Sequence, residues 1–259
     1  MLKHRQAYWA FRKMGLRGLF IHLMTRVLGD AHFLRPASSI DFRALEMDQF
    51  QTLEQLLHSL LPKVPMATIQ GALLDAEKFH DSIERSSAIS MEFPDRWNSG
   101  THLQILLYAF VRLTRPSVVV ETGTANGASA NSIAGALHAN NFGRLFTFDL
   151  EITNAPLVSK NLRGRIEFVH TNGTESFLRN YMLPHMSHRH ISLFLHDADH
   201  SYLGQMQDYA VAKELKFSYI FSDDVDTSLA FCDFAGEFGK IFFDAPKFIG
   251  CYINSKELR

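Results

Sequence analysis

The sequence predicts an α/β protein with a doubly wound, seven-stranded, mostly parallel sheet, and three observations support this prediction. A β-branched run at 118–120 is followed by a glycine turn, a helical stretch over 128–139 and a second apolar run at 145–148. Neither run alternates between apolar and polar residues, which is typical of strands buried on both faces of a parallel sheet. Short apolar runs and helical segments continue to alternate up to residue 253.

Residues 1–95 are expected to form an N-terminal helical extension, and residues 96–259 the α/β domain. Residues 1–29 contain no acidic residue and place apolar side chains at helical spacing, so they predict a basic amphipathic helix. One interpretation of this helix is a weak contact with a membrane surface or an anionic substrate. We favour the other interpretation, in which it packs on its own domain or on a second subunit.

Two further helices are expected in the extension. Ser38 and Asp41 have the spacing of a capping box, which predicts a helix from Ser38 to Leu60. A second helix is expected over 67–86, and a loop at 91–100 marks the domain boundary. Because these helices are long for connectors, we expect them to form a lid, a wall of the substrate site or a dimer surface in a homo-oligomer.

The α/β domain begins with a helix over 101–113 that leads directly into the first strand. A helix over 204–215 separates the fourth strand from the fifth. The last two strands are joined by only three residues, which predicts a terminal antiparallel hairpin at one edge of the sheet and an antiparallel last strand. The strands expected after 145–148 span 166–169, 191–195, 219–221, 241–244 and 248–253.

Composition excludes several classes of protein. The chain has 259 residues, 46% of them hydrophobic, which is enough for a sizeable core, and its formal net charge of −1 does not favour nucleic acid as a partner. Its two cysteines, Cys232 and Cys251, predict neither a disulfide framework nor a zinc site. No apolar run approaches membrane-spanning length, so we expect a cytoplasmic protein.

The glycine turn indicates the kind of ligand. It has the spacing Gly123-x-x-x-Gly127, not the G-x-G-x-x-G of a pyrophosphate site, and Glu121 just before it would repel phosphate but suits an ammonium group. S-adenosylmethionine carries an ammonium, a sulfonium and a ribose but no phosphate, and Asp149 could accept both ribose hydroxyls. Asn172 is a candidate for the adenine edge, or only part of a tight turn. The residues expected to contact this cofactor are Glu121, Thr122, Gly123, Gly127, Ser129, Asp149, Asn172 and Asp197.

Acidic residues also follow two other strands. Asp197 follows one strand, Asp223 and Asp224 follow the next, and the carboxyl ends of parallel strands meet at one edge of a sheet. No lysine or arginine lies near them in sequence, so three carboxylates predict a site for Mg²⁺ or Mn²⁺. Such a metal would lower the pKa of a substrate hydroxyl, and His200 could accept its proton. A helix cap, a hydrogen bond to the ligand and a structural histidine are the plainer roles for these side chains.

Four stretches resemble the class I S-adenosylmethionine-dependent methyltransferases, which have a Rossmann-like fold. They are Val-Val-Glu-Thr-Gly-Thr-Ala-Asn-Gly-Ala-Ser, Phe-Thr-Phe-Asp, Phe-Leu-His-Asp-Ala-Asp-His-Ser-Tyr and Phe-Ser-Asp-Asp-Val. More narrowly, the chain is similar to the D-x-D-H-S-Y group, which includes cephalosporin hydroxylases and macrolide or sugar O-methyltransferases. It also looks like catechol O-methyltransferase at the same places. The resemblance spans about Trp97 to Asp244 and leaves the first ninety or so residues uncovered.

The resemblance implies roles for individual residues. Glu121 matches the family's acid before the glycine turn, Ser129 its serine at the helix start, and Asp149 its ribose-binding acid. Asp197, Asp223 and Asp224 would take the magnesium positions. His200 stands where the catechol enzyme has its catalytic lysine, and some sugar enzymes use instead the aspartate that corresponds to Asp199, so either of these two side chains is a candidate base.

These features together predict a metal-assisted O-methyltransferase acting on a hydroxyl group of a small molecule or sugar. Transfer to oxygen would use both the metal, which would bind the acceptor hydroxyl, and the base, which would take its proton. Transfer to nitrogen or carbon would leave the aspartate cluster without a function. Two alternatives stay open: a non-catalytic nucleoside-binding or scaffold protein of the same fold, and a metal-dependent hydroxylase. An iron site for the latter would use two histidines and one carboxylate, for which His196, His200 and Asp197 are available.

Overall fold

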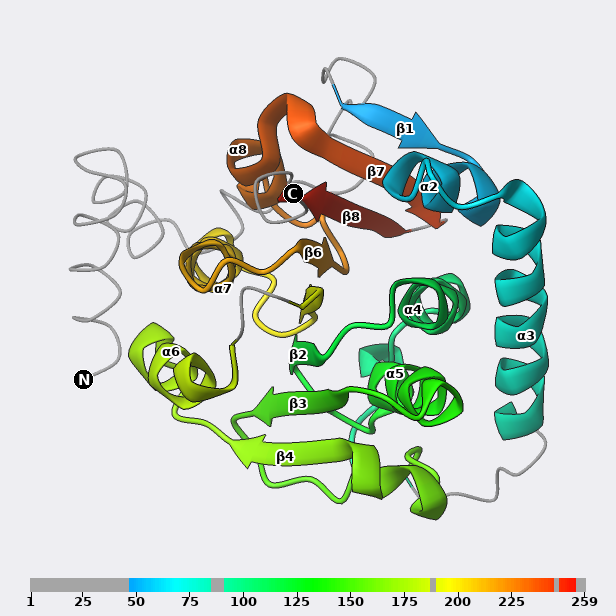
Figure 1. Cartoon of the computed structure of the whole chain (residues 1–259). Coiled ribbons are helices and arrows are strands. Elements are labelled where there is room, and N and C mark those ends of the chain that lie inside the picture. Colours follow the sequence, from blue (N-terminus) through cyan, green and yellow to red (C-terminus); the bar gives the residue numbers. More distant parts are fainter. Residues whose placement is uncertain (1–46, 85–90, 187–189, 245–246, 255–259) are drawn as a thin grey trace.

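The computed structural model describes residues 47–84, 91–186, 190–244 and 247–254, and it contains one mixed sheet with helices on both faces (Figure 1). The strand order is β1-β7-β8-β6-β5-β2-β3-β4. Strand β8 runs antiparallel to β6 and β7, and all other pairings are parallel. The strands are β1 (Asp48–Phe50), β2 (Val118–Thr122), β3 (Arg144–Asp149), β4 (Ile166–His170), β5 (Ser192–His196), β6 (Tyr219–Ser222), β7 (Gly239–Asp244) and β8 (Lys247–Ile253).

Two layers of helices cover the sheet. Figure 1 shows α2, α3, α4 and α5 on one side of it and α6, α7 and α8 on the other. Their bounds are α2 (Leu53–Leu60), α3 (Met66–Glu84), α4 (Thr101–Thr114), α5 (Ala128–Asn140), α6 (Glu175–Met182), α7 (Tyr202–Glu214) and α8 (Ala230–Ala235). Short 3₁₀ helices occur at Asp95–Trp97, Lys160–Arg165, Leu183–His185 and Gly236–Phe238.

Each face of the sheet has its own hydrophobic core. On β2, Val119 belongs to one core and Val118 and Val120 belong to the other, because successive side chains of a strand point to opposite faces. Both cores are closed by helices, which explains why the run at 118–120 is apolar on both faces and shows no alternation. The non-alternating runs therefore predicted a doubly wound sheet correctly.

The described part of the N-terminal extension joins this sheet and core. Strand β1 pairs with β7, and α2 and α3 contribute Leu56 and Ile69 to the same core as α4 and α5. The helix expected from Ser38 is confirmed over Leu53–Leu60, which is α2, but is wrong before it, because residues 48–50 are a strand. The helix begins at Leu53 because Thr52 Oγ1 accepts a hydrogen bond from the Gln55 backbone at 3.2 Å. The predicted basic helix at 1–29 and the capping box at Ser38 lie outside the described residues.

The sheet also differs from the expected one at its end. It has eight strands and not seven, and β8 inserts between β6 and β7, so the hairpin does not form the edge that was predicted. Strand β1 takes that edge. The last strand is antiparallel, as expected. Within the described ranges, no helix combines the length and apolar character needed to cross a membrane.

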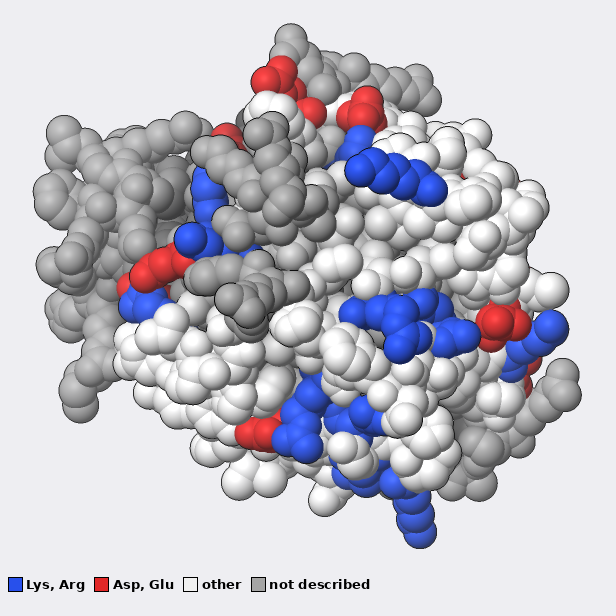
Figure 2. All heavy atoms as spheres, in the orientation of Figure 1, with Lys and Arg blue, Asp and Glu red and all other residues white. Residues whose placement is uncertain are grey.

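Charged side chains are unevenly spread over the face shown in Figure 2. Many of the lysines and arginines visible there lie over the part where Figure 1 draws α4, α5 and the segment before β4. Arginines of this region already have partners, since Arg112 bonds the Asn140 side chain and Arg165 bonds the Asn141 side chain. These two arginines therefore contribute to hydrogen bonds that stabilise the fold.

Candidate active site

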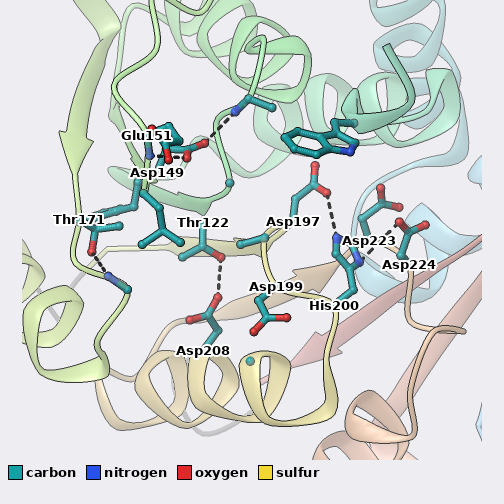
Figure 3. A pocket seen from close by; sticks show the side chains of 18 of the residues that line it. Thr122, Asp149, Glu151, Thr171, Asp197, Asp199, His200, Asp208, Asp223 and Asp224 are labelled. Atoms are coloured by element: carbon teal, nitrogen blue, oxygen red, sulfur yellow. Dashed lines mark hydrogen bonds and ion pairs between the residues drawn. The ribbon is translucent and has the colours of Figure 1, made fainter. Parts of the chain in front are cut away.

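A cavity of ≈ 660 Å³ opens at the carboxyl ends of β2, β3, β5 and β6. This is the edge at which open α/β sheets bind their ligands. Figure 3 shows Asp149 and Glu151 together at one end of it and Asp197, His200, Asp223 and Asp224 at the other. The first group follows β3 and the second follows β5 and β6, so the strand order brings the predicted cofactor and acceptor residues into one cavity.

The glycine turn after β2 is tightly enclosed. Gly123 has φ +92°, and a Cβ atom on it would lie 1.9 Å from the backbone oxygen of Asp197. Gly127 has φ +85° and directly precedes α5, and a Cβ atom there would lie 2.7 Å from Val158. Both positions require glycine, because side chains rarely adopt this conformation and no space exists for one. The turn therefore brings its backbone close to the loop that carries Asp197.

Asp149 holds this turn from the neighbouring strand. Its Oδ2 accepts hydrogen bonds from the backbone N–H groups of Thr124 at 2.9 Å and Ala125 at 3.0 Å, and its Oδ1 accepts one from Glu151 at 3.0 Å. Asp149 also lines the cavity. The carboxylate thus fixes the cavity wall and retains lone pairs that could accept further hydrogen bonds.

Glu121 is fully buried and does not line the cavity. Thr147 Oγ1 donates to its Oε2 at 2.5 Å, and Ser129 gives a second side-chain hydrogen bond. Burial raises the pKa of Glu121 to about 7 despite these two bonds, and the charge on Asp149 adds to the rise. The hydrogen bond between Glu121 and Ser129 therefore lies buried beneath the glycine turn.

Only some of the other residues predicted to bind the cofactor line the cavity. Thr122, Gly123 and Asp197 line it together with Asp149, whereas Gly127 and Asn172 do not. Asn172 Oδ1 accepts hydrogen bonds from the Thr174 backbone at 3.1 Å and from its hydroxyl at 2.7 Å, next to the start of α6. Its amide oxygen thus orders the turn before α6, while Thr171 and Gly173 on either side reach the cavity.

The acidic end contains two basic side chains. His200 lies between two of the predicted metal ligands, with its Nε2 3.8 Å from Asp197 Oδ1 and its Nδ1 3.5 Å from Asp224 Oδ2. Lys247 Nζ lies 3.0 Å from Asp224 Oδ1 and 3.6 Å from Asp223 Oδ2. The sequence correctly predicted that the three aspartates lie close together. It did not reveal the lysine, which comes from the antiparallel strand β8.

Burial determines the charges at this end. It raises the pKa of Asp197 well above its ordinary value, and the nearby charge of Asp223 adds to the rise. Burial also lowers the pKa of His200 to about 4, with His196 as the next cause, so this imidazole is neutral at pH 7. Burial opposes the charge of Lys247 too, but the carboxylates of Asp223 and Asp224 outweigh it and raise the pKa of the ammonium group.

A divalent cation does not fit this arrangement. Mg²⁺ needs carboxylate oxygens free to approach to about 2.1 Å. In this structure the ammonium group of Lys247 stands against both oxygens of Asp224 (3.0 and 3.1 Å) and faces Asp223. In the part of the chain that is described, no group of three His, Cys, Asp or Glu side chains has the geometry of a metal site.

The two candidate bases have different surroundings. Asp199 Oδ1 accepts a hydrogen bond from the Ser201 backbone at 3.0 Å, and the side chain lies against Gly204 in the first turn of α7. Figure 3 shows Asp199 pointing toward that helix, whereas His200 points toward Asp197 and Asp224. Both line the cavity, but only His200 lies among the acids of the acceptor end.

A histidine–aspartate pair at the cavity wall was missed by the sequence reasoning. His196 Nδ1 lies 2.7 Å from Asp208 Oδ2, and Thr122 Oγ1 donates to the same oxygen at 2.6 Å. His196 is fully buried and does not line the cavity, while Asp208 does. Position 208, six residues after the first residue of α7, carried no motif, so no sequence signal pointed to it.

A second missed feature is the strap, residues 91–98, which contributes three residues to the cavity lining. The Asn126 side chain makes four hydrogen bonds to it, accepting from the Glu92 and Phe93 backbones and donating to the Phe93 oxygen and to Asn98. Glu92 in turn accepts from the Asn154 backbone and side chain. These bonds hold Phe93 and Trp97 of the strap, whose rings lie 5.7 Å apart, in the cavity lining.

Comparisons with known proteins found one matching family and several similar structures. The model of a methyltransferase domain family matches residues 120–225, which run from the second half of β2 to just beyond Asp224. No curated protein matches the chain.

Among solved structures, the chain is similar to an SAH-bound methyltransferase, PaMTH1, from Podospora anserina (15% identity, 59% of this chain and 70% of that one, TM-score 0.39). It is also similar to an O-methyltransferase from Bacillus cereus in complex with SAH (16% identity, 79% and 98%, TM-score 0.43). A third is the O-methyltransferase TomG from Streptomyces achromogenes in complex with SAM (17% identity, 78% and 96%, TM-score 0.42). The family match begins one residue inside the first of the four stretches on which the sequence resemblance was based and covers the other three completely, so it confirms that resemblance over residues 120–225.

Proposed function

We propose that this protein binds S-adenosylmethionine at the Asp149 end of the cavity and transfers its methyl group to a hydroxyl oxygen of a small molecule or sugar held at the Asp197 end. One observation carries the proposal: the glycine turn, the acid after β3 and the acid–histidine cluster line a single cavity of ≈ 660 Å³. This volume lies within the range of about 300–1,000 Å³ that is usual for small-molecule sites.

At the cofactor end, Asp149 would accept hydrogen bonds from the ribose hydroxyls. The backbone of Gly123 would approach the methionine part, because that position has no side chain. Gly127 and Ser129 do not line the cavity, so we assign them to the shape of the turn and not to direct contact with the ligand. Since Glu121 does not line the cavity, we assign it a field effect on the ammonium group and the positioning of Ser129.

At the acceptor end, His200 would take the proton of the acceptor hydroxyl. Its oxygen then forms a bond to the methyl carbon, and the carbon–sulfur bond breaks with its electron pair staying on the sulfur. His200 is neutral at pH 7 and can therefore accept a proton, but its lowered pKa makes it a weak base, so the imidazolium that forms would depend on stabilisation by Asp224, 3.5 Å away. Asp199 is the second candidate, although its carboxylate already bonds the start of α7.

The metal assistance predicted from the sequence is not part of this mechanism. A cation at Asp197, Asp223 and Asp224 would have to displace the ammonium group of Lys247. No step of the proposed mechanism therefore uses a metal ion.

Calorimetric titration with S-adenosylhomocysteine tests the cofactor assignment. We expect saturable binding that weakens at least about tenfold in Asp149→Ala, because hydrogen bonds to a charged group contribute about 1.5–3 kcal/mol each. The matched control is Asp75→Ala, which removes an exposed carboxylate from α3 outside the cavity. A folded protein that does not bind would contradict the proposal. Binding without methyl transfer to any of a panel of sugars, phenols and polyketides would favour the scaffold alternative.

A further inference from the structure

Lys247 reaches the cavity because of the direction of its strand. The parallel strands end at this edge of the sheet, whereas antiparallel β8 begins there, next to the end of β6, with Ser222 opposite Gly250. Two hydrogen bonds fix this beginning: Val225 N donates to the Phe248 oxygen at 3.1 Å, and Phe248 N donates to Asp226 Oδ1 at 3.0 Å. The first side chain of β8 is therefore held against the loop that carries Asp223 and Asp224.

The ammonium group has the contacts of a bound cation. Its distances of 3.0 and 3.1 Å to the two oxygens of Asp224 are those of a charge-assisted hydrogen bond, and Asp223 lies 3.6 Å away on its other side. Asp223 is buried, so its charge needs compensation from within the protein. Lys247 also lines the cavity, so a bound acceptor could touch it.

We propose that Lys247 is the resident cation of this site: it takes the place of a divalent metal at Asp223 and Asp224 and donates a hydrogen bond to the acceptor oxygen. During transfer the lysine keeps its three protons and stabilises the negative charge that develops on that oxygen as His200 takes the hydroxyl proton. The part of this inference that concerns the acceptor rests on the proposed function, whereas the exclusion of a metal does not.

Binding of Mn²⁺, followed by electron paramagnetic resonance on chelator-treated protein, tests the exclusion directly. We expect the wild-type protein to bind no Mn²⁺ at this site at millimolar concentration. Lys247→Met removes the charge with little change in volume and should create a site that binds at least about thirtyfold more tightly, because a like charge about 4 Å away is removed. Lys247→Met combined with Asp224→Asn should lose that site again.

The matched control is Lys240→Met. Lys240 lies on the adjacent strand β7 and is paired with Asp48 at 2.7 Å, outside the cavity, so its removal should create no Mn²⁺ site. Stoichiometric Mn²⁺ binding by the wild-type protein, abolished by Asp224→Asn, would overturn the inference. Equal lack of binding in the wild-type and Lys247→Met proteins would also overturn it, because the lysine would then not be what keeps the cation out.

Titration with S-adenosylhomocysteine separates this test from that of the proposed function. Retained binding in Lys247→Met would show that the variant is folded and that its cofactor end is intact. With an acceptor identified, we expect EDTA to leave wild-type turnover unchanged. In Lys247→Met, kcat should fall about a hundredfold and recover in part with Mg²⁺, consistent with the loss of one preorganised charge at a developing oxyanion. Inhibition of the wild-type enzyme by EDTA would refute the role of the lysine even if the protein is a methyltransferase.

Discussion

Glu121 gives a prediction whose size follows directly from the structure. Its side chain is completely buried beneath the glycine turn, and burial raises its pKa from 4.5 to about 7. Glu121→Gln keeps an oxygen that can accept the hydrogen bond from Thr147 and removes the charge. The substitution therefore isolates the cost of ionising a carboxyl group at this position.

The direction of the effect follows from proton binding. In the unfolded chain this carboxyl group loses its proton near pH 4.5, whereas the folded protein keeps it up to about pH 7. The folded state thus binds more protons in this window, and the free energy of unfolding must fall as the pH rises through it. The difference between the two pKa values corresponds to about 3 kcal/mol, which is lost by pH 8 and stays lost above it.

Urea unfolding followed by circular dichroism at pH 5, 6, 7 and 8 measures this contribution. We expect Glu121→Gln to gain about 2.5 kcal/mol relative to the wild-type protein between pH 5 and 8, whatever its absolute stability. The matched control is Glu167→Gln on β4, whose carboxyl group has a pKa lowered by a hydrogen bond from Tyr181. Its difference from the wild-type protein should change little in this range. A Glu121→Gln difference that is flat or falls with pH would refute the reasoning.

Two further predictions concern the walls of the cavity. Gly123→Ala should abolish S-adenosylhomocysteine binding and lower the Tm, because the new Cβ would lie 1.9 Å from the Asp197 oxygen. The same substitution at Gly71, in α3 with nothing within 4 Å, should instead stabilise the protein by about 0.5–1 kcal/mol. Asn126→Ala removes four hydrogen bonds from the strap and should destabilise the protein by about 2 kcal/mol. It should also shift the Trp97 emission to the red in a Trp9→Phe background, whereas Asn180→Ala on the exposed face of α6 should do neither.

The parallel part of the fold was predictable from the sequence because its strands are buried on both faces. The run at 118–120 contains no polar residue and that at 191–195 contains only Ser192, and each was found as a strand to within two residues. Strand β1 has no such pattern. Its residues Asp-Gln-Phe become a strand only because β7 offers an unpaired edge, and Asp48 meets Lys240 across it. A pairing over so long a stretch of chain leaves no local signal.

The acids of the site were predictable for a similar reason, since parallel strands all end at the same edge of a sheet. Asp149, Asp197 and Asp223 each follow a strand directly, so their convergence needed only the fold class. Asn126 was not predictable, because it occupies one of the unspecified positions of the Gly123-x-x-x-Gly127 turn, and its partners lie 28 to 34 residues earlier in the sequence.

Lys247 shows how an error in the predicted position of one strand changes the chemistry that is inferred for a site. With the final hairpin at the edge of the sheet, as the sequence suggested, the start of β8 would be one strand further from Asp223, and the three aspartates would lack a counter-charge. Three such carboxylates call for a metal. The observed order places β8 directly beside β6, and the lysine that begins it meets the acids that end β6. The order of two strands therefore decides whether the cation of this site comes from solution or from the chain itself.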